Sequence, residues 1–200
     1  MKVDPAVRES RESAPRARFA RLLGMHVVER EWREASGQHV AGVWLGRLPE
    51  GWFVFHDVPA GERGATIEQV VIGPSGVFTI TTKNLSGSIR VNPRSIVHDG
   101  HRTSFLPKAS DEARRTASLL SSAVDRDIHV RGLLAILADE WIVRELPPDV
   151  YVGGPRSVKH WMFKQPPILR SSDVIVLAAA ASRPETWTTD PRLHPASAAT

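Results

Sequence analysis

The segment at residues 67–89 constrains the fold more than any other part of the chain. It reads IEQVVIGPSGVFTITTKNLSGSI, with two runs of apolar and β-branched residues on either side of the sequence GPSG. Such runs favour strands, and the GPSG sequence favours a tight turn between them. We therefore predict strands over 65–72 and 77–83 that form a hairpin, with Lys83 at the end of the second strand.

The rest of the chain alternates between strand and helix patterns. Further strands are predicted at 52–58, at 88–91 as a continuation of the hairpin into a meander, and at 96–97, 102–105, 133–137, 141–143 and 150–152. Helices are predicted at 34–48, 111–124, 157–163 and 173–182. Ser110 and Ser172 are the expected N-caps of the second and fourth helices, and acidic residues occupy the expected first turn after Ser110. This order of elements predicts an α/β or α+β fold with a mixed sheet.

Composition limits the classes of protein that fit. The 200 residues, 42% of them hydrophobic, support one domain, which we place at 21–187 between a flexible basic tail at 1–20 and a disordered tail at 188–200. The chain has no cysteine, which excludes disulfides and thiolate metal sites. Its longest apolar run, at 174–181, is shorter than the roughly 20 residues that span a bilayer. We therefore expect a cytoplasmic protein with no membrane partner.

Several short motifs recur in one known family. They are GQ at 37–38, HDV at 56–58, IEQVVIGP at 67–74, GVF at 76–78, ITTKN at 80–84, Gly87, and NP at 92–93. Together they resemble the nuclease-related domain family of the restriction-endonuclease-like superfamily, most firmly over 37–93. The resemblance implies an α/β fold with a mixed β-sheet core flanked by helices.

The resemblance also implies a chemistry. In that superfamily two or three carboxylates hold Mg²⁺ for phosphodiester hydrolysis, and a lysine stabilises charge on the attacking water or the phosphate. An acid and a lysine two residues apart on a strand point to the same face, so both reach one phosphate. Lys83 matches the family lysine, and Glu68 stands where the family usually has Asp. Thr81 and Gln38 stand where the family has acids, so two of the three expected carboxylates are neutral.

The loss of two carboxylates changes the charge of the expected site. Three carboxylates and one lysine would balance one Mg²⁺, whereas Glu68 and Lys83 sum to zero. Neutral amide and hydroxyl oxygens offset the dehydration of a hard divalent cation poorly. No cofactor is therefore expected, and Mg²⁺ would bind only if the site is active. Asp57 and Glu34 are the acids that we consider as replacement ligands.

Basic residues follow the lysine strand along the chain. In the family's layout they would rim the site and contact a nucleic-acid backbone, DNA or RNA. The candidates are Arg90, Arg94, Arg102, Arg114 and Arg115, with Lys108 beside them.

Three functions are open at this point. The first is a degenerate nuclease that retains nucleic-acid or partner binding but cleaves poorly. The second is an active Mg²⁺-dependent nuclease whose carboxylate ligands have migrated to other positions. The third is a protein-interaction or regulatory module that never contacts nucleic acid. Mild excess positive charge, 26 basic against 22 acidic residues, permits all three.

Overall fold

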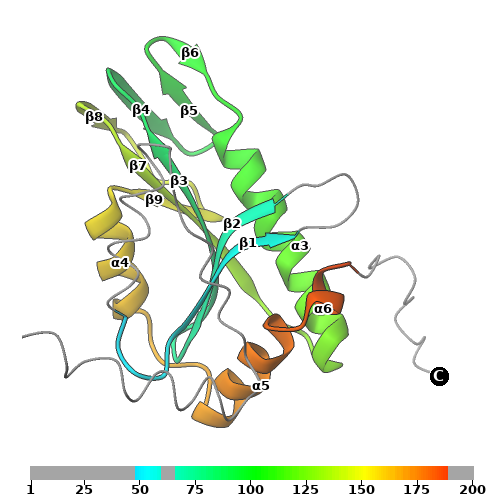
Figure 1. The fold of residues 1–200 in the computed structure, drawn as a ribbon. Helices are drawn as coiled ribbons and strands as arrows, with labels where there is room; N and C mark the ends of the chain where they lie inside the picture. The colour runs from blue at the N-terminus through cyan, green and yellow to red at the C-terminus, as the bar shows by residue number, and fades with distance from the viewer. Residues whose placement is uncertain (1–47, 60–65, 189–200) are drawn as a thin grey trace, which may run out of the picture. The chain divides into compact units, whose positions relative to one another are not determined.

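The hairpin around GPSG lies at the centre of the larger of two β-sheets (Figure 1). The structure is a computed structural model that describes residues 48–59 and 66–188. Strands β2 (Thr66–Gly73) and β3 (Gly76–Asn84) pair antiparallel up to the closing pair Gly73↔Gly76. Gly76 has φ +130°, a conformation that residues with a side chain rarely adopt. The predicted hairpin is thus confirmed.

The larger sheet is mixed, as predicted. Its order is β1-β2-β3-β7-β9, in which β1–β2 and β2–β3 are antiparallel and β3–β7 and β7–β9 are parallel. Its other three strands are β1 (Phe53–Pro59), β7 (Val130–Leu137) and β9 (Val150–Gly153). The parallel pairs bring together strands that are far apart in sequence.

A second sheet has the order β6-β5-β4-β8. Its strands are β4 (Ser88–Asn92), β5 (Ser95–His98), β6 (His101–Arg102) and β8 (Glu140–Val143). The prediction that 88–91 continues the meander of the larger sheet was therefore wrong: β4 pairs with β5 and β8 and leaves β3. The hairpin through Asp99 and Gly100 is confirmed, with φ of 46° and 84°, but its second strand ends at Arg102 because a helix begins at Phe105.

Four helices lie in the described part of the chain. They are α3 (Phe105–Val124), α4 (Pro155–Lys164), α5 (Ser171–Ala181) and α6 (Pro184–Thr188). The N-cap of α3 is Ser104, not Ser110. The helix starts earlier than predicted because Leu106 and Ala109 already belong to its buried apolar face. Pro107 is tolerated in the first turn, where amide groups have no intrahelical partner. Arg170, not Ser172, is the N-cap of α5.

The helices cover the larger sheet on both faces (Figure 1). Helices α3 and α5 pack on one face in a core that includes Val70, Val77 and Leu177. Helix α4 packs on the other face, where Phe78 and Met162 are buried. A third apolar cluster joins the N-terminal half of α3 to the second sheet. Helix α3 therefore bridges the two sheets, and it also contacts β3.

Some expectations cannot be compared with the structure. The helix predicted at 34–48 and the tails predicted at 1–20 and 188–200 lie outside the described residues, apart from Leu48 and Thr188. Thr188 was expected in the disordered tail but is the last residue of α6. Within the described ranges, every helix is too short or too polar to cross a bilayer.

Candidate nuclease-type site

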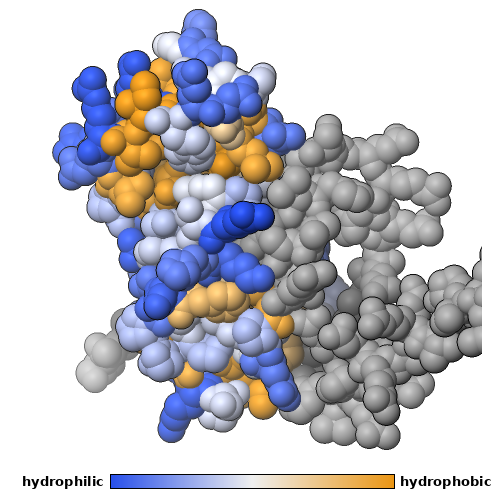
Figure 2. Space-filling view, turned by 90° about the vertical axis from the view of Figure 1, so that its left-hand side faces the viewer, coloured by the Kyte–Doolittle hydropathy of each residue, from blue (hydrophilic) through white to orange (hydrophobic). Residues whose placement is uncertain are grey.

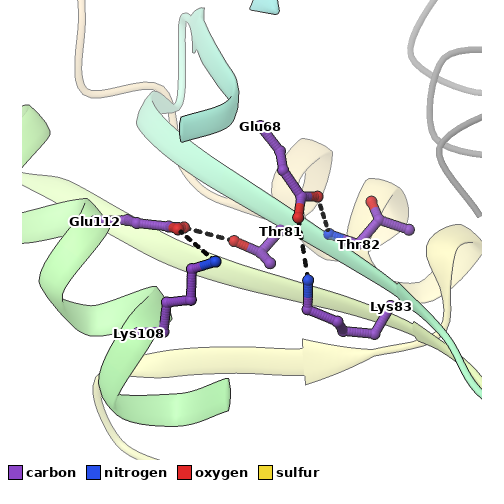
Figure 3. Close-up of polar contacts among 6 residues, drawn as sticks. All are labelled: Glu68, Thr81, Thr82, Lys83, Lys108 and Glu112. Atoms are coloured by element: carbon purple, nitrogen blue, oxygen red, sulfur yellow. Dashed lines mark hydrogen bonds and ion pairs between the residues drawn. The ribbon is translucent and has the colours of Figure 1, made fainter. Parts of the chain in front are cut away.

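Glu68, Thr81 and Lys83, which the sequence analysis singled out, lie close together on the larger sheet (Figure 3). The carboxylate of Glu68 on β2 accepts a hydrogen bond from Lys83 Nζ at 3.1 Å and another from the Thr82 amide at 2.6 Å (Figure 3). The regular β2–β3 pairing stops one residue earlier, at Gln69↔Ile80. The Glu68 carboxylate thus accepts the hydrogen bond of the Thr82 amide, which a carbonyl of β2 would accept if the pairing continued.

Glu68 and Lys83 form an ion pair that remains accessible. Their side chains are 23% and 24% exposed, respectively. Both oxygens of the carboxylate are engaged, one by the ammonium group and one by the backbone. The positive charge of Lys83 is therefore balanced by Glu68 before any ligand arrives, although the Lys83 side chain is partly exposed.

Thr81 contacts an acid that the sequence patterns did not single out. Its hydroxyl donates a hydrogen bond to Oε2 of Glu112 at 2.6 Å (Figure 3). Glu112 belongs to α3 and is buried, and Lys108 Nζ lies 3.9 Å from its other oxygen. The site thus contains a second carboxylate, supplied by a helix far from β3 in sequence.

Burial dominates the electrostatics of Glu112. Removal from water raises the pKa of its carboxyl group above the usual value, and the charge of Glu68 acts in the same direction. The hydrogen bond from Thr81 and the charge of Lys108 oppose this shift, but they do not cancel it. Glu112 is therefore an acid whose ionisation is disfavoured by its place in the fold.

A glycine allows α3 to approach the sheet at this point. Gly132 lies on β7 beside Thr79 of β3. A Cβ atom at position 132 would lie 2.9 Å from the carbonyl oxygen of Ala109, closer than real Cβ atoms come to backbone. Because glycine has no Cβ atom, Ala109 packs directly on β7, and Glu112 reaches Thr81 from the next turn of the helix.

A pocket of about 490 Å³ opens beside Glu112. Its lining residues are Thr66, Ser104, Pro107, Lys108, Asp111, Glu112 and Arg115. Arg115 has a buried Nε without a hydrogen-bond partner among the described residues. The pocket thus combines two cationic side chains, Lys108 and Arg115, with hydroxyl groups and with two acids, Asp111 and Glu112. The formal charges of its lining therefore sum to zero.

The five arginines expected at a nucleic-acid interface do not gather in one place. Arg115 lines the pocket, whereas Arg114 is exposed and pairs with Asp111. The others lie on the second sheet: Arg90 is exposed on β4, Arg94 follows β4, and the Arg102 guanidinium on β6 donates to the Arg94 carbonyl. The structure therefore brings one of the five to the pocket, together with Lys108.

The expected replacement ligands are placed as follows. Asp57 is exposed on β1 and has φ 48°. Its neighbours on the strand pair with β2, His56 with Gln69 and Val58 with Ile67. That register sets Asp57 across from Glu68. Gln38 and Glu34 lie outside the described residues. Within the described part of the chain, no three His, Asp or Glu side chains are grouped closely enough to hold a metal ion.

The described donors do not fit a Mg²⁺ ion. Glu68 and Glu112 are the carboxylates at the site, and each faces a lysine, so the four charges sum to zero. The Thr81 hydroxyl donates a hydrogen bond to Glu112 and carries no negative charge. A hard divalent cation needs several anionic or strongly polar oxygens to replace its water. We therefore derive no metal-dependent step from these residues.

The family model described as "Nuclease-related domain" matches residues 33–137, more than half of the chain. The chain belongs to the nuclease-related domain family. The match covers Glu68, Thr81, Lys83 and Glu112 and ends with β7. No curated protein matches the chain, and no solved structure does.

Membership of this family agrees with the fold. Its restriction-endonuclease-like core is a mixed sheet flanked by helices, as observed here. Strands β8 and β9 and helices α4 to α6 lie beyond the matched segment. The candidate site lies within the part of the chain that the family defines.

Glu112 was not singled out in the sequence. From sequence it was expected in the first turn of a helix at 111–124, where an acid favours the helix dipole. Because α3 begins at Phe105, Glu112 lies inside the helix, between the buried residues Ala109 and Thr116. A charged residue on the buried stripe of an amphipathic helix is the one sequence signal that points to a special role.

Proposed function

We propose that this nuclease-related domain is a degenerate nuclease that binds nucleic acid and cleaves it poorly. The observation that supports this proposal best is the arrangement around Thr81. Its neutral hydroxyl satisfies Glu112, while Glu68 is held by Lys83 and by a backbone amide. The described carboxylates are thus committed to internal contacts.

Binding would depend on three cationic side chains. Lys108 and Arg115 line the pocket beside Glu112, and the partly exposed Lys83 lies on the other side of Thr81. Phosphate contacts of this type are independent of base sequence and weaken steeply as salt displaces them. We therefore propose a DNA or RNA backbone as the ligand.

Poor cleavage follows from the missing anionic ligands. Each charge-assisted contact to an ion is worth about 1.5–3 kcal/mol, so replacing one acid by Thr81 weakens metal binding substantially. Glu112 does not restore the lost charge, since Lys108 faces one of its oxygens and the Thr81 hydroxyl is hydrogen-bonded to the other. Hydrolysis that depends on a metal-activated water would be correspondingly slow.

One observation favours a second candidate, an active Mg²⁺-dependent nuclease with migrated ligands. Glu112 places a carboxylate beside Thr81, at the strand position where the family has an acid. In that case Glu112 and Glu68 would both be needed for cleavage. The two candidates thus differ in the expected effect of Glu112→Gln on phosphodiester hydrolysis.

A combined binding and cleavage experiment tests the proposal. Fluorescein-labelled single-stranded DNA, duplex DNA and RNA are titrated with the full chain at several salt concentrations, and anisotropy reports binding. The same samples, with Mg²⁺ or Mn²⁺, are run on denaturing gels. We expect salt-dependent binding that is weakened in Lys83→Ala and Arg115→Ala but not in Lys164→Ala, together with intact strands.

Two results would contradict the proposal. Robust cleavage that is lost in both Glu68→Gln and Glu112→Gln would establish the active nuclease instead. Complete absence of binding at low salt would favour the third hypothesis, a protein-interaction module. Lys164 is the matched control because it ends α4, which packs on the sheet face opposite to α3.

A further inference from the structure

Among the described strands, β8 lies at one edge of the second sheet. It pairs in parallel with β4, and the amides of Glu140 and Arg144 donate to carbonyls on the β4 side. In such a ladder alternate residues point their backbone groups to opposite sides, so the N–H and C=O groups of Trp141 and Val143 face away from β4. Among the described strands, none pairs with that outer edge.

Apolar side chains are exposed along the same edge. Ile142, Val143 and Leu146 are 45%, 51% and 44% exposed, and they are three of the five large apolar residues that are exposed in the described part of the chain. Figure 2, which views the molecule from the β8 side, shows apolar surface gathered in its upper part among hydrophilic residues. Open, apolar edge strands invite pairing with another strand.

The sequence of β8 is complementary to itself when reversed. Residues 140–144 read EWIVR. If two copies align antiparallel with Ile142 opposite Ile142 of the second copy, Glu140 lies opposite Arg144 and Trp141 opposite Val143. Within the described residues, Glu140 and Arg144 form no ion pair in the single chain. Opposite charges directly across an antiparallel pair are stabilising.

The backbone agrees with this alignment. Trp141 and Val143 are the residues whose N–H and C=O groups face the open edge, and in the same register they are opposite each other. They would exchange both of their hydrogen bonds, while Ile142 forms the non-hydrogen-bonded pair at the two-fold axis, where side chains come closest. Charge, apolar contact and hydrogen bonding thus select the same register.

We propose that two copies of this chain pair through β8 to form a two-fold symmetric dimer. The paired second sheets would then form one continuous sheet that runs from β6 of one copy to β6 of the other. An isologous contact of this type closes on itself, so it protects the edge without allowing longer assemblies. The inference concerns β8, beyond the family-matched segment, and is independent of the proposed nucleic-acid binding.

Charge exchange across the two-fold axis provides the test. The full chain is examined by sedimentation velocity and light scattering over a range of concentrations, without nucleic acid. We expect a concentration-dependent dimer. Glu140→Arg and Arg144→Glu should each weaken it about tenfold, because each change converts two attractive cross-strand pairs into two repulsive ones. The double variant Glu140→Arg, Arg144→Glu should restore the dimer.

Control variants separate this interface from general surface effects. Val176→Lys changes an exposed apolar residue on α5 and should leave the dimer unchanged. Circular dichroism and urea unfolding show whether each variant is folded. A wild-type chain that stays monomeric at its highest soluble concentration would overturn the proposal. So would a dimer that the double variant does not restore, since another surface or another register would then hold it.

Discussion

The hydroxyl of Thr81 donates a 2.6 Å hydrogen bond to Glu112 and thereby joins the lysine strand β3 to the helix α3. A carboxylate at position 81 would instead face the Glu112 carboxylate, and two acids in contact below the surface need a cation or a shared proton. Threonine removes that need. Thr81 thus satisfies the buried acid without adding a second negative charge.

Replacement of Thr81 by valine should destabilise the protein by about 1–3 kcal/mol, because the buried Glu112 carboxylate loses its hydrogen-bond donor while the shape of the side chain is kept. Urea unfolding measures the change. Thr81→Ser keeps a hydroxyl and should lose much less. Equal losses in the two variants would show that the hydrogen bond contributes nothing to stability.

The stability of the folded state should depend on the ionisation of Glu112. Burial raises the pKa of this carboxyl above its usual value of 4.5. Between the two values the folded protein binds more protons than the unfolded chain, so this group's contribution is complete below about pH 4.5 and is lost as pH rises through the folded pKa. The free energy of unfolding of Glu112→Gln, minus that of the wild type, should therefore increase with pH.

Taking the difference between the two proteins is necessary because other acids act in the opposite direction. The pKa of Asp99 is lowered mainly by the Ser88 amide, and that of Asp173 mainly by Arg126. Both contribute equally to the wild type and to Glu112→Gln, so they cancel. A difference that stays flat from pH 4 to pH 8, or one that falls, would contradict the raised pKa.

Substitution of Gly132 by alanine should cost about 1–3 kcal/mol, because the new Cβ atom lies too close to the Ala109 carbonyl and forces α3 away from β7. Gly154→Ala is the matched control, since its Cβ meets its nearest neighbour only at 3.9 Å and the change should cost at most about 1 kcal/mol. Comparison of the two unfolding midpoints checks the prediction. If both variants lose the same stability, the close approach at Gly132 is not what positions the helix.

Neutralisation of Glu68 should strengthen nucleic-acid binding. Glu68→Gln removes the partner that balances Lys83, and a partly exposed ion pair of this type is worth up to about 1 kcal/mol, which corresponds to a gain of roughly twofold to fivefold in affinity. Fluorescence anisotropy with labelled DNA measures the gain. Glu50→Gln, at an exposed turn outside the site, controls for the overall change in charge. A loss of affinity in Glu68→Gln would indicate that Glu68 supports binding instead of opposing it.

Local sequence patterns were sufficient for the part of the site that lies on the hairpin. The turn at 73–76 and the strand period of two placed Lys83 and Thr81 on one face, with Glu68 beside them, as the hydrogen bonds confirm. Glu112 was missed because its position depends on where α3 packs. That packing is set by Gly132 and by the apolar residues from Leu106 onward, which no local pattern connects to β3.

The division of the strands into two sheets was also beyond local patterns. The sequence pattern predicted that β4 extends the hairpin, whereas β4 pairs in parallel with β8, about fifty residues further along the chain. Pairing over such a separation depends on tertiary packing of the intervening helix and strand. The prediction that α3 starts at 111 was wrong for a related reason. The helix begins at Phe105, and the apolar residues of its first turns pack against the second sheet, which local patterns did not predict.

Calorimetric titration of the full chain with Mn²⁺ tests the central claim most directly, because it measures metal binding without relying on catalysis. The wild type is compared with the double variant Glu68→Gln, Glu112→Gln. Since the described carboxylates are held by lysines, a threonine and a backbone amide, we expect no saturable heat in the wild type beyond that of the double variant. Stoichiometric uptake of one Mn²⁺ per wild-type chain, abolished in the double variant, would contradict the account.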